Sequence, residues 1–513
     1  MKRENAAAPP ERGRRLPELF FFLALFLGML LFYVFAHPLV LLSLDDWAYF
    51  GYARIALPFP TFWNPSRVLP EVLMPLCGNL AALLYACFGD YGKAQIFSLA
   101  LAFSLCIAGY IFSFCRLLRK KLGLARFPAM LLSLGFLLLH FFLFRSRESG
   151  NIHLFYETDV VCVFFYTIPA MLNAALLMLD LADDFLLDIL KPGKPAKKAL
   201  LVLAVYLAVF SNLFGSVLFA AYVGCRLLAA IPAARKEKQR FPGFLKAQLS
   251  RLLVLLAWLI SALFEVMGGR AAASRGDPRP LGGKLGEALG WFAQLCGKMS
   301  PLFLALLAAG LLFAARMLLL RKKDAQRHGP LLRPLGLFLA TALLCLVFLV
   351  LLCAVVEPAY LVQPGTAFPV LFFLPLFLCW CAGYALHRRE RLVLLLPLAL
   401  LVIYTATDTR SRSFADYNCL GLSAQTCMEI NDDLLRQVRQ AEEAGQREIV
   451  LKTMDTGVEY DNWPHSTIYL GDTLADLFYK HGLVSEPVRI TIQPSQDFNL
   501  AHGLRFGGDG ARD

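Results

Sequence analysis

Long apolar runs separated by short polar loops occupy the first 406 residues of the chain. Twelve runs can be delimited, at residues 19–44, 71–89, 94–118, 127–144, 158–180, 199–211, 214–231, 249–267, 299–320, 334–356, 367–386 and 391–406. A helix of about 20 apolar residues is long enough to cross the hydrocarbon core of a bilayer. The pattern therefore predicts an all-α polytopic membrane domain over residues 19–406, preceded by a basic segment at residues 1–18 that we expect in the cytoplasm.

The pattern changes after residue 406, where apolar runs of that length stop. Residues 430–444 have the spacing of an amphipathic helix, 448–452 of a strand, 473–481 of a helix and 488–492 of a strand. We therefore expect residues 407–513 to form a small C-terminal α/β domain.

Composition excludes several classes of protein. Hydrophobic residues make up 58% of the chain and charged residues only 17%, whereas a soluble domain carries roughly 25% charged residues. A soluble enzyme, a disordered chain and a coiled coil are excluded.

The net charge of +12 divides into +19 for residues 1–406 and −7 for residues 407–513. The basic excess thus lies in the membrane part, where it sets orientation, and it does not indicate nucleic acid.

Charge distribution also predicts which loops face the cytoplasm. If all twelve runs crossed, the basic loop at residues 116–126 and every later basic loop would face outward, against the positive-inside rule. Residues 71–89 contain Pro75, Gly78 and Asn79, so we expect them to form a juxtamembrane helix on the outer face. About eleven spanning helices remain, with the N-terminus cytoplasmic and the C-terminal domain extracytoplasmic. Inward segments then hold 30 Lys and Arg residues, against ten in the outward membrane loops.

Two further features concern processing and redox state. The first apolar run is too long for the core of a cleaved signal peptide, so we expect it to remain as a helix. Eleven of the 13 cysteines lie in or near apolar segments, where a thiol is a small core residue. Cys419 and Cys427 share a polar segment and could form a disulfide outside the cytoplasm, although two free thiols are an alternative.

The first outward loop has the most distinctive polar residues. Asp45 and Asp46 follow the first helix directly, and the loop continues to Trp63 and Arg67. Adjacent carboxylates at a membrane face repel each other and are costly to desolvate, so the pKa of one should rise unless a cation lies near. Such an environment suits a general base, with Arg67 or a metal as the compensating charge. The alternative is a solvated helix end whose tryptophans belong to the interfacial belt.

Polar residues in later loops are further candidates. Arg145 and Arg147 lie on the side that should be poor in arginine, where the planar guanidinium could bind a phosphate. The alternative is local pairing of either arginine with Glu148 or Glu157. Weaker candidates are Asp159, Asn212 in a helical hairpin, Glu265 near a helix end, and Glu357 before a proline. The chain contains no P-loop, nucleophile elbow, zinc motif or dinucleotide fingerprint.

The layout of the first loop resembles that of the GT-C glycosyltransferases. These proteins have a first helix that ends outside in an acidic pair, followed by an extended loop and a juxtamembrane helix with an arginine. The segments Asp45-Asp46-Trp47 and Trp63-Asn64-Pro65-Ser66-Arg67 resemble those of the bacterial O-antigen glucosyltransferase-like membrane proteins. Asn462-Trp463-Pro464 in the tail is similar to their outer domain. The hairpin Ser211-Asn212-Leu213 lacks the carboxylate that relatives often have there.

The resemblance implies transfer of a sugar from a polyprenyl-phosphate donor to a cell-envelope glycan or glycolipid acceptor, at the outer face of a bacterial inner membrane. It implies Asp45 as the base, with Asp46 as its orienter or as the second candidate for the base, and Arg67 with one of Arg145 or Arg147 on the donor phosphate. Candidates for a second acidic or acceptor-binding group are Glu148, Glu157, Asp159, Asn212 and Glu357, and candidates for stacking on sugar are Trp47, Trp63 and Tyr156. No cofactor is certain, although some relatives use a divalent cation, which Asp45 and Asp46 would hold.

Three other functions fit the same sequence pattern. A transporter or flippase of lipid-linked glycans would place charge near the bilayer midplane, whereas the apolar cores here are nearly free of charge. A polymerase or ligase of lipid-linked oligosaccharides would have a similar sequence. A catalytically inactive membrane scaffold is the third alternative.

Overall fold

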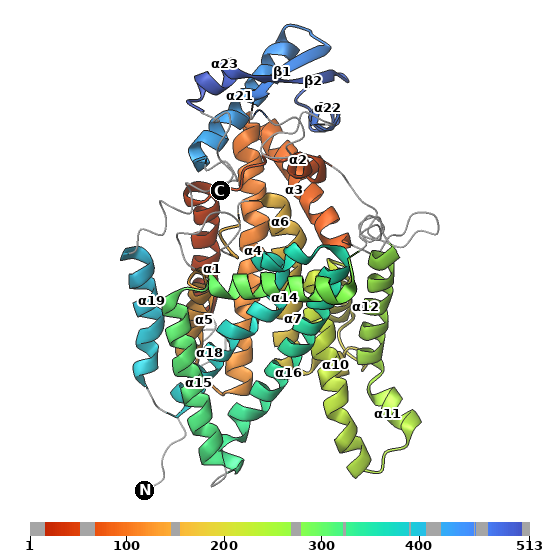
Figure 1. The fold of residues 1–513 in the computed structure, drawn as a ribbon, viewed down its shortest axis with the longest axis vertical. Coiled ribbons are helices and arrows are strands. Elements are labelled where there is room, and N and C mark those ends of the chain that lie inside the picture. Colours follow the sequence, from red (N-terminus) through yellow and green to blue (C-terminus); the bar gives the residue numbers. More distant parts are fainter. Residues whose placement is uncertain are drawn as a thin grey trace.

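A computed structural model describes residues 16–51, 67–144, 154–157, 159–267, 279–321, 325–388, 391–406, 422–455, 457 and 470–504. Helices of the membrane part run mostly side by side, and a small domain with two strands lies at one end of them (Figure 1). Helix α14 lies across the other helices in Figure 1, at the level where α12 ends.

The membrane part contains the following helices: α1 Leu16–Leu31, α2 Leu44–Gly51, α3 Val68–Phe88, α4 Tyr91–Lys121, α5 Arg126–Phe141, α6 Val160–Cys162, α7 Ile168–Asp183, α8 Phe185–Asp188, α9 Pro195–Val209, α10 Leu213–Lys236, α11 Phe241–Ala247, α12 Leu249–Met267, α14 Leu281–Gly297, α15 Pro301–Arg321, α16 Ala325–Val356, α17 Pro364–Leu371, α18 Phe373–His387 and α19 Leu395–Ala406. Two π-helical segments, Phe32–Ala36 and Val163–Thr167, continue α1 and join α6 to α7. Two short 3₁₀ segments, Pro358–Val362 and Arg391–Leu394, precede α17 and α19.

Nine helices of the described residues are long and apolar enough to cross a membrane, which makes the chain a multi-pass membrane protein. Eight of them coincide with runs that we expected to cross, and the ninth is Val68–Phe88, which we expected to lie on the outer face. The other three expected runs form α5, α9 and α19, of 16, 15 and 12 residues. Each of these three helices is shorter than the roughly 20 residues that a helix normally needs to cross the hydrocarbon core.

The basic segments lie together at one end of the bundle, where they form ion pairs with acidic residues of neighbouring helices. Glu18 at the start of α1 accepts from Arg119 near the end of α4 at 2.7 Å. Arg116 pairs with Asp183 at the end of α7, and Lys121 lies 3.9 Å from Asp184. The expected inward segments at residues 116–126 and 181–198 therefore meet, at the opposite end of α4 from the small domain (Figure 1).

The small domain contains α21 Ala424–Glu443, β1 Glu448–Met454, α22 Leu470–Lys480, β2 Arg489–Ser495 and α23 Gln496–Ala501. The strands pair in parallel, with Glu448 opposite Arg489 and Met454 opposite Ser495. Successive side chains of a strand point to opposite faces of the sheet. Every second residue along most of β1 is accordingly buried, and the strand packs against α21 and α23. The bounds of β1, α22 and β2 lie within three residues of those expected, whereas α21 begins six residues earlier than expected and α23 was not predicted.

The small domain rests on α2, α3 and the start of α4. Trp47 of α2 is fully buried against Phe478 of α22, with ring centroids 6.1 Å apart. The Tyr91 hydroxyl and His481 Nδ1 form a buried hydrogen bond of 2.5 Å. Asn431 of α21 donates to the carbonyl of Leu41 at 2.7 Å, just before α2 begins. The acidic pair at the start of α2 is thus fixed between the bundle and the small domain.

The structure describes one of the two cysteines that we expected could form a disulfide. Cys427 is buried in α21, and Cys419 lies outside the described residues, so the pairing of these two thiols stays a prediction.

The contact between α2 and α3 gives a testable prediction. A Cβ at Gly78 would lie 2.2 Å from the carbonyl oxygen of Phe50, so the two backbones approach as only glycine allows. We expect Gly78→Ala to lower the free energy of unfolding by about 1–3 kcal/mol, measured by thermal unfolding in detergent. Gly109→Ala, at a helical glycine with open space around its Cβ position, is the matched control and should be neutral or stabilising by up to about 1 kcal/mol. Equal stability of both variants would contradict the close approach.

Candidate functional site

Asp46 is a fully buried carboxyl at the start of α2. Its Oδ2 accepts from the backbone N–H groups of Leu42 and Ser43, both at 3.0 Å. The Ser43 hydroxyl in turn accepts from the Asp46 N–H at 3.1 Å. These reciprocal bonds form a capping box, which satisfies backbone donors that the first turn of a helix leaves free. The spacing Ser43-x-x-Asp46 is the sequence signal of this role, which we did not predict.

The other oxygen of Asp46 reaches a segment 115 residues further along the chain. Oδ1 accepts from the N–H of Val161 at 3.0 Å, in the first turn of α6. Asp159 caps the same helix by accepting from the Cys162 N–H at 3.0 Å. Two carboxyls thus share one helix N-terminus, where the helix dipole favours negative charge. We expected Arg67 or a metal to compensate the acidic pair, but the described contacts show backbone N–H groups in that role.

Burial governs the ionisation of this carboxyl pair. Removal from water raises the pKa of Asp46 to about 8, and the negative charge of Asp159 adds to the rise, against three backbone N–H bonds that lower it. The pKa of Asp159 is also raised, chiefly by burial, with Asp45 contributing a like charge. The pair therefore holds a proton near neutral pH.

Asp45 and Asp46 differ sharply in their access to solvent. Asp45 belongs to the same first turn of α2, but its side chain is exposed. The carboxylate of Asp45 is open to solvent, whereas the buried carboxyl of Asp46 bonds the backbone of the turn to which both residues belong.

Two π-helical segments border the acidic group. Phe32–Ala36 lies between α1 and α2, and Val163–Thr167 follows the helix turn that binds Asp46. Tyr33 donates to the carbonyl of Phe155 at 2.8 Å, and His37 Nε2 donates to the carbonyl of Glu157 at 3.2 Å. The Glu157 side chain accepts from the Asp159 N–H at 3.2 Å. Single π-turns are frequent at functional sites, and here they hold the second acidic segment beside the first.

Arg67 lies outside this acidic group. It precedes α3 with a left-handed backbone, φ +57°, and its Nη2 pairs with Glu265 Oε1 at 2.6 Å. The next residue, Val68, donates to the carbonyl of Phe210 in the hairpin before α10 at 2.7 Å. In the described part of the chain, no hydrogen bond or ion pair joins Arg67 to either aspartate of α2. Glu265, a weaker candidate in the sequence, is thus the partner of the arginine that we expected on the donor phosphate.

The hairpin nevertheless connects Arg67 to α2 through a short chain of contacts. Asn212 donates to the carbonyl of Phe165 at 2.8 Å. The ring of Phe165 lies 4.6 Å, centroid to centroid, from that of Tyr49 in α2. These contacts join the Arg67 segment to α2 through the hairpin, without a direct contact between Arg67 and the acidic pair among the described residues.

Two weaker candidates have local structural roles. The Asn212 side chain also caps α10, accepting from the Phe214 N–H at 3.0 Å, so both ends of its amide are used. Glu357 is exposed and accepts from the Ala359 N–H at 3.3 Å at the start of a 3₁₀ turn. Neither contact brings these residues to the acidic group.

The aromatic candidates are buried rather than presented to solvent. Trp47 is enclosed between α2 and α22, and Tyr156 packs in a cluster with Phe32, His37 and Phe141. Their ring faces contact protein, so we no longer consider them as surfaces for stacking sugar. The sequence does not distinguish a buried aromatic residue from an exposed one when it lies beside an acidic residue at a helix end.

Several candidates lie outside the described residues. They are Trp63 in the first loop, Arg145, Arg147 and Glu148 in the second, and the tail segment Asn462-Trp463-Pro464. Their assignments remain predictions from the sequence.

The donor set at Asp46 does not fit a divalent cation. Both of its oxygens point at backbone N–H groups, which would repel a metal ion. Among the residues that the structure describes, no group of three or more His, Cys, Asp or Glu side chains has an arrangement that could hold a metal. We therefore derive no step through a bound cation.

The chain matches no known protein family, and neither a curated protein nor a solved structure shows detectable similarity to it. The resemblance to GT-C glycosyltransferases rests on short sequence segments of the first loop and of the tail.

The raised pKa of Asp46 gives a prediction about stability. The folded state retains a proton that the unfolded chain releases above pH 4, so this group's contribution is present at low pH and is lost as the pH rises toward 8. We expect the melting temperature in detergent to fall from pH 5 to pH 8, and Asp46→Asn to flatten that slope. The variant should also lose about 1–3 kcal/mol of stability at pH 5, because an amide nitrogen cannot accept from a backbone N–H.

Asp472→Asn is the control, since Asp472 is an exposed carboxylate at the start of α22. It should retain the slope of the unmodified protein. An Asp46→Asn protein with that same slope would contradict a buried, proton-holding carboxyl.

Proposed function

We propose that the protein is a membrane glycosyltransferase that moves a sugar from a polyprenyl-phosphate donor to a cell-envelope acceptor at the outer face of the bacterial inner membrane. The observation that carries the proposal is the acidic turn of α2, in which an exposed Asp45 adjoins a buried, capped Asp46. The first-loop resemblance places the reactive pair of GT-C enzymes at this position.

The chemistry needs one base and one site for an anion. A lipid phosphate leaves as an anion, so the leaving group needs stabilisation by cations rather than a general acid. The acceptor hydroxyl needs a base close enough to take its proton as it attacks the anomeric carbon. Asp45 is the base in this proposal, and Asp46 is the positioning residue that fixes the turn. Glu157 and Asp159 keep the α6 end in register with that turn.

The proposed orientation places the small domain outside. We infer that α3 does not cross the membrane, because both of its ends contact parts on the small-domain side. Its start binds the hairpin at Phe210, and Arg439 of α21 donates to the carbonyl of Gly89 just after its end, at 3.5 Å. With α5, α9 and α19 counted as short crossings, eleven spans give a cytoplasmic N-terminus and an extracytoplasmic tail.

Arg67 is the proposed contact for the donor phosphate. A guanidinium has five N–H donors in a planar fork, and Glu265 uses Nη2. The remaining donors can bind a phosphate while Glu265 holds the side chain in place. The side chains of this pair are 17% and 19% exposed, so the ion pair can be reached from outside the core.

Removal of the proposed base tests the reaction. Asp45→Asn should lower sugar transfer by at least about 100-fold, since general-base catalysis contributes roughly 10²–10⁴. The assay follows labelled sugar from the polyprenyl-phosphate donor to envelope glycan in isolated membranes. Glu448→Gln, an exposed carboxylate on β1, is the matched control and should transfer normally. Unchanged transfer by an Asp45→Asn protein with an unaltered melting temperature would remove Asp45 from the mechanism.

Substitution of the arginine tests the donor site. We expect Arg67→Ala to raise KM for the polyprenyl-phosphate donor about tenfold or more, because charge-assisted hydrogen bonds to the phosphate are lost. Arg67→Lys should restore only part of the affinity, since an ammonium cannot bind in a bidentate fashion. Lys93→Ala serves as the control, because Lys93 is an exposed cation on the same side. Full donor affinity in Arg67→Ala would rule out this role.

A further inference from the structure

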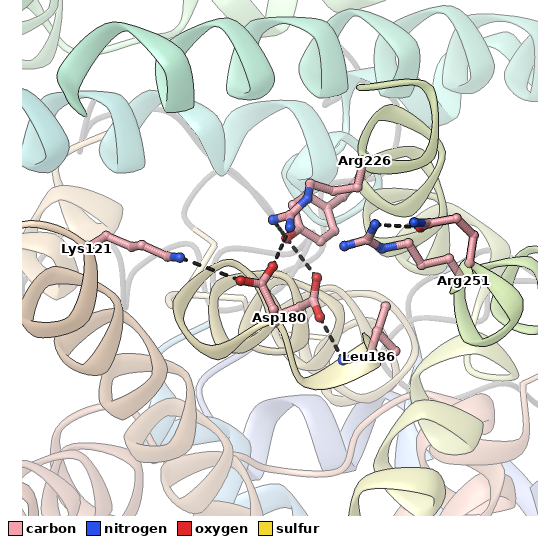
Figure 2. A network of polar contacts seen from close by, with 8 residues as sticks. Lys121, Asp180, Leu186, Arg226 and Arg251 are labelled. Carbon is pink, nitrogen blue, oxygen red and sulfur yellow. Dashed lines mark hydrogen bonds and ion pairs between the residues drawn. The ribbon is translucent and has the colours of Figure 1, made fainter. Parts of the chain in front are cut away.

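A second polar cluster lies inside the bundle, far along α4 from the acidic turn of α2. It joins the ends of α4, α7 and α8 to α10 and α12 (Figure 2). Asp180 is fully buried and accepts from the Tyr222 hydroxyl at 3.0 Å and from the Leu186 N–H at 2.9 Å. Arg226 donates to the same hydroxyl at 3.0 Å and pairs with Asp184. These groups satisfy one another within the cluster.

Arg251 is the exception. It is only 3% exposed, and its Nη1 donates to Gln248 at 2.7 Å. Its Nε and Nη2 are buried and have no hydrogen-bond partner among the described residues. Figure 2 shows the guanidinium directed toward Asp180 and Arg226. A buried cation with two unused donors is costly, so the arrangement favours an acceptor that binds both at once.

The charges of the cluster favour an anion as that acceptor. The cations are Lys121, Arg226 and Arg251, and the carboxylates facing them are Asp180 and Asp184. One positive charge is left over, and it belongs to the side chain with the free donors. The planar fork of arginine matches two oxygens of a phosphate.

An apolar groove adjoins the cluster and indicates what carries the phosphate. The groove has a volume of about 250 Å³ and is formed by α8, α9 and α12, with Leu186, Tyr206, Val209, Ser250, Val254 and Ala257 among its lining residues. Leu186 belongs to both features, because its N–H donates to Asp180. Ser250 precedes Arg251 in α12. Arg251 does not itself line the groove, but Ser250 and Val254 of the same helix do, so the groove runs beside the residue with the unused donors.

We propose that this groove and Arg251 bind a phosphate-bearing lipid of the leaflet on the basic side of the bundle. The chain of the lipid occupies the groove, and its phosphate accepts from Nε and Nη2 of Arg251. The site lies at the opposite end of the bundle from Asp45, so it is independent of the proposed sugar transfer and is tested without it.

The test uses the full-length protein, delipidated in detergent, with phosphatidylglycerol and diacylglycerol as probes. We expect phosphatidylglycerol to raise the melting temperature and to remain bound in native mass spectrometry, and diacylglycerol, which lacks the phosphate, to do neither. Arg251→Gln should weaken phosphatidylglycerol binding about tenfold or more, because two charge-assisted bonds are lost. Arg251→Lys should retain part of the binding, and Ala257→Phe should reduce it by filling the groove.

Arg235→Gln is the matched control, since Arg235 is an exposed cation at the end of α10, and it should bind the lipid normally. Three results would overturn the proposal. They are equal effects of diacylglycerol and phosphatidylglycerol, unchanged binding by Arg251→Gln, and stabilisation by inorganic phosphate alone that matches that of the lipid. The comparison of the two lipids on the unmodified protein holds even if a variant fails to fold.

Discussion

The end of the bundle next to the small domain depends on the buried carboxyl of Asp46. Three backbone N–H groups from two distant segments converge on it, from Leu42 and Ser43 on one side and Val161 on the other. Each such donor, if left buried without a partner, costs about 1–3 kcal/mol. Because the partners are backbone groups, the arrangement exists only while residues 42–46 and 159–161 keep their local conformations. The carboxyl therefore specifies backbone geometry as well as joining two helices.

The small domain adds a second constraint on the same helix. One face of α2 packs through Trp47 against α22, while the carbonyl of Phe50 touches α3 at Gly78. Burial of a large aromatic side chain contributes roughly 1.5–3 kcal/mol, so separating the domain from the bundle would be costly. The exposed carboxylate of Asp45 is held by contributions from both parts, which gives a short helix the rigidity that a reactive group needs.

The sequence predicted the helical membrane part and the elements of the tail well. Apolar run length and residue periodicity are local properties, and they located β1, α22 and β2 to within three residues. Residues 37–43 are not helical, although they are apolar enough to extend the first helix. The backbone instead turns, and the N–H groups of Leu42 and Ser43 donate to Asp46 in the first turn of α2. Hydropathy does not reveal this exchange of helical hydrogen bonds for bonds to a side chain.

The candidate site was predicted less completely, because its contacts are long-range. Arg67 and Glu265 are 198 residues apart, and each could have paired with other groups. Asp46 and Asp159 were both candidates, but their common attachment to one helix N-terminus required the fold. Trp47 was misplaced because an aromatic residue at a membrane interface and one under a docked domain have the same sequence environment.

The hydrogen bond between Tyr91 and His481 has a consequence for how the small domain responds to pH. Burial lowers the pKa of His481 to about 4, with the charge of Lys480 contributing. The imidazole therefore stays neutral from mildly acidic to alkaline surroundings and introduces no positive charge where the domain meets the helices. Mild acidification that would protonate an ordinary histidine should leave this one neutral, so the contact between the small domain and the helices persists as the pH changes.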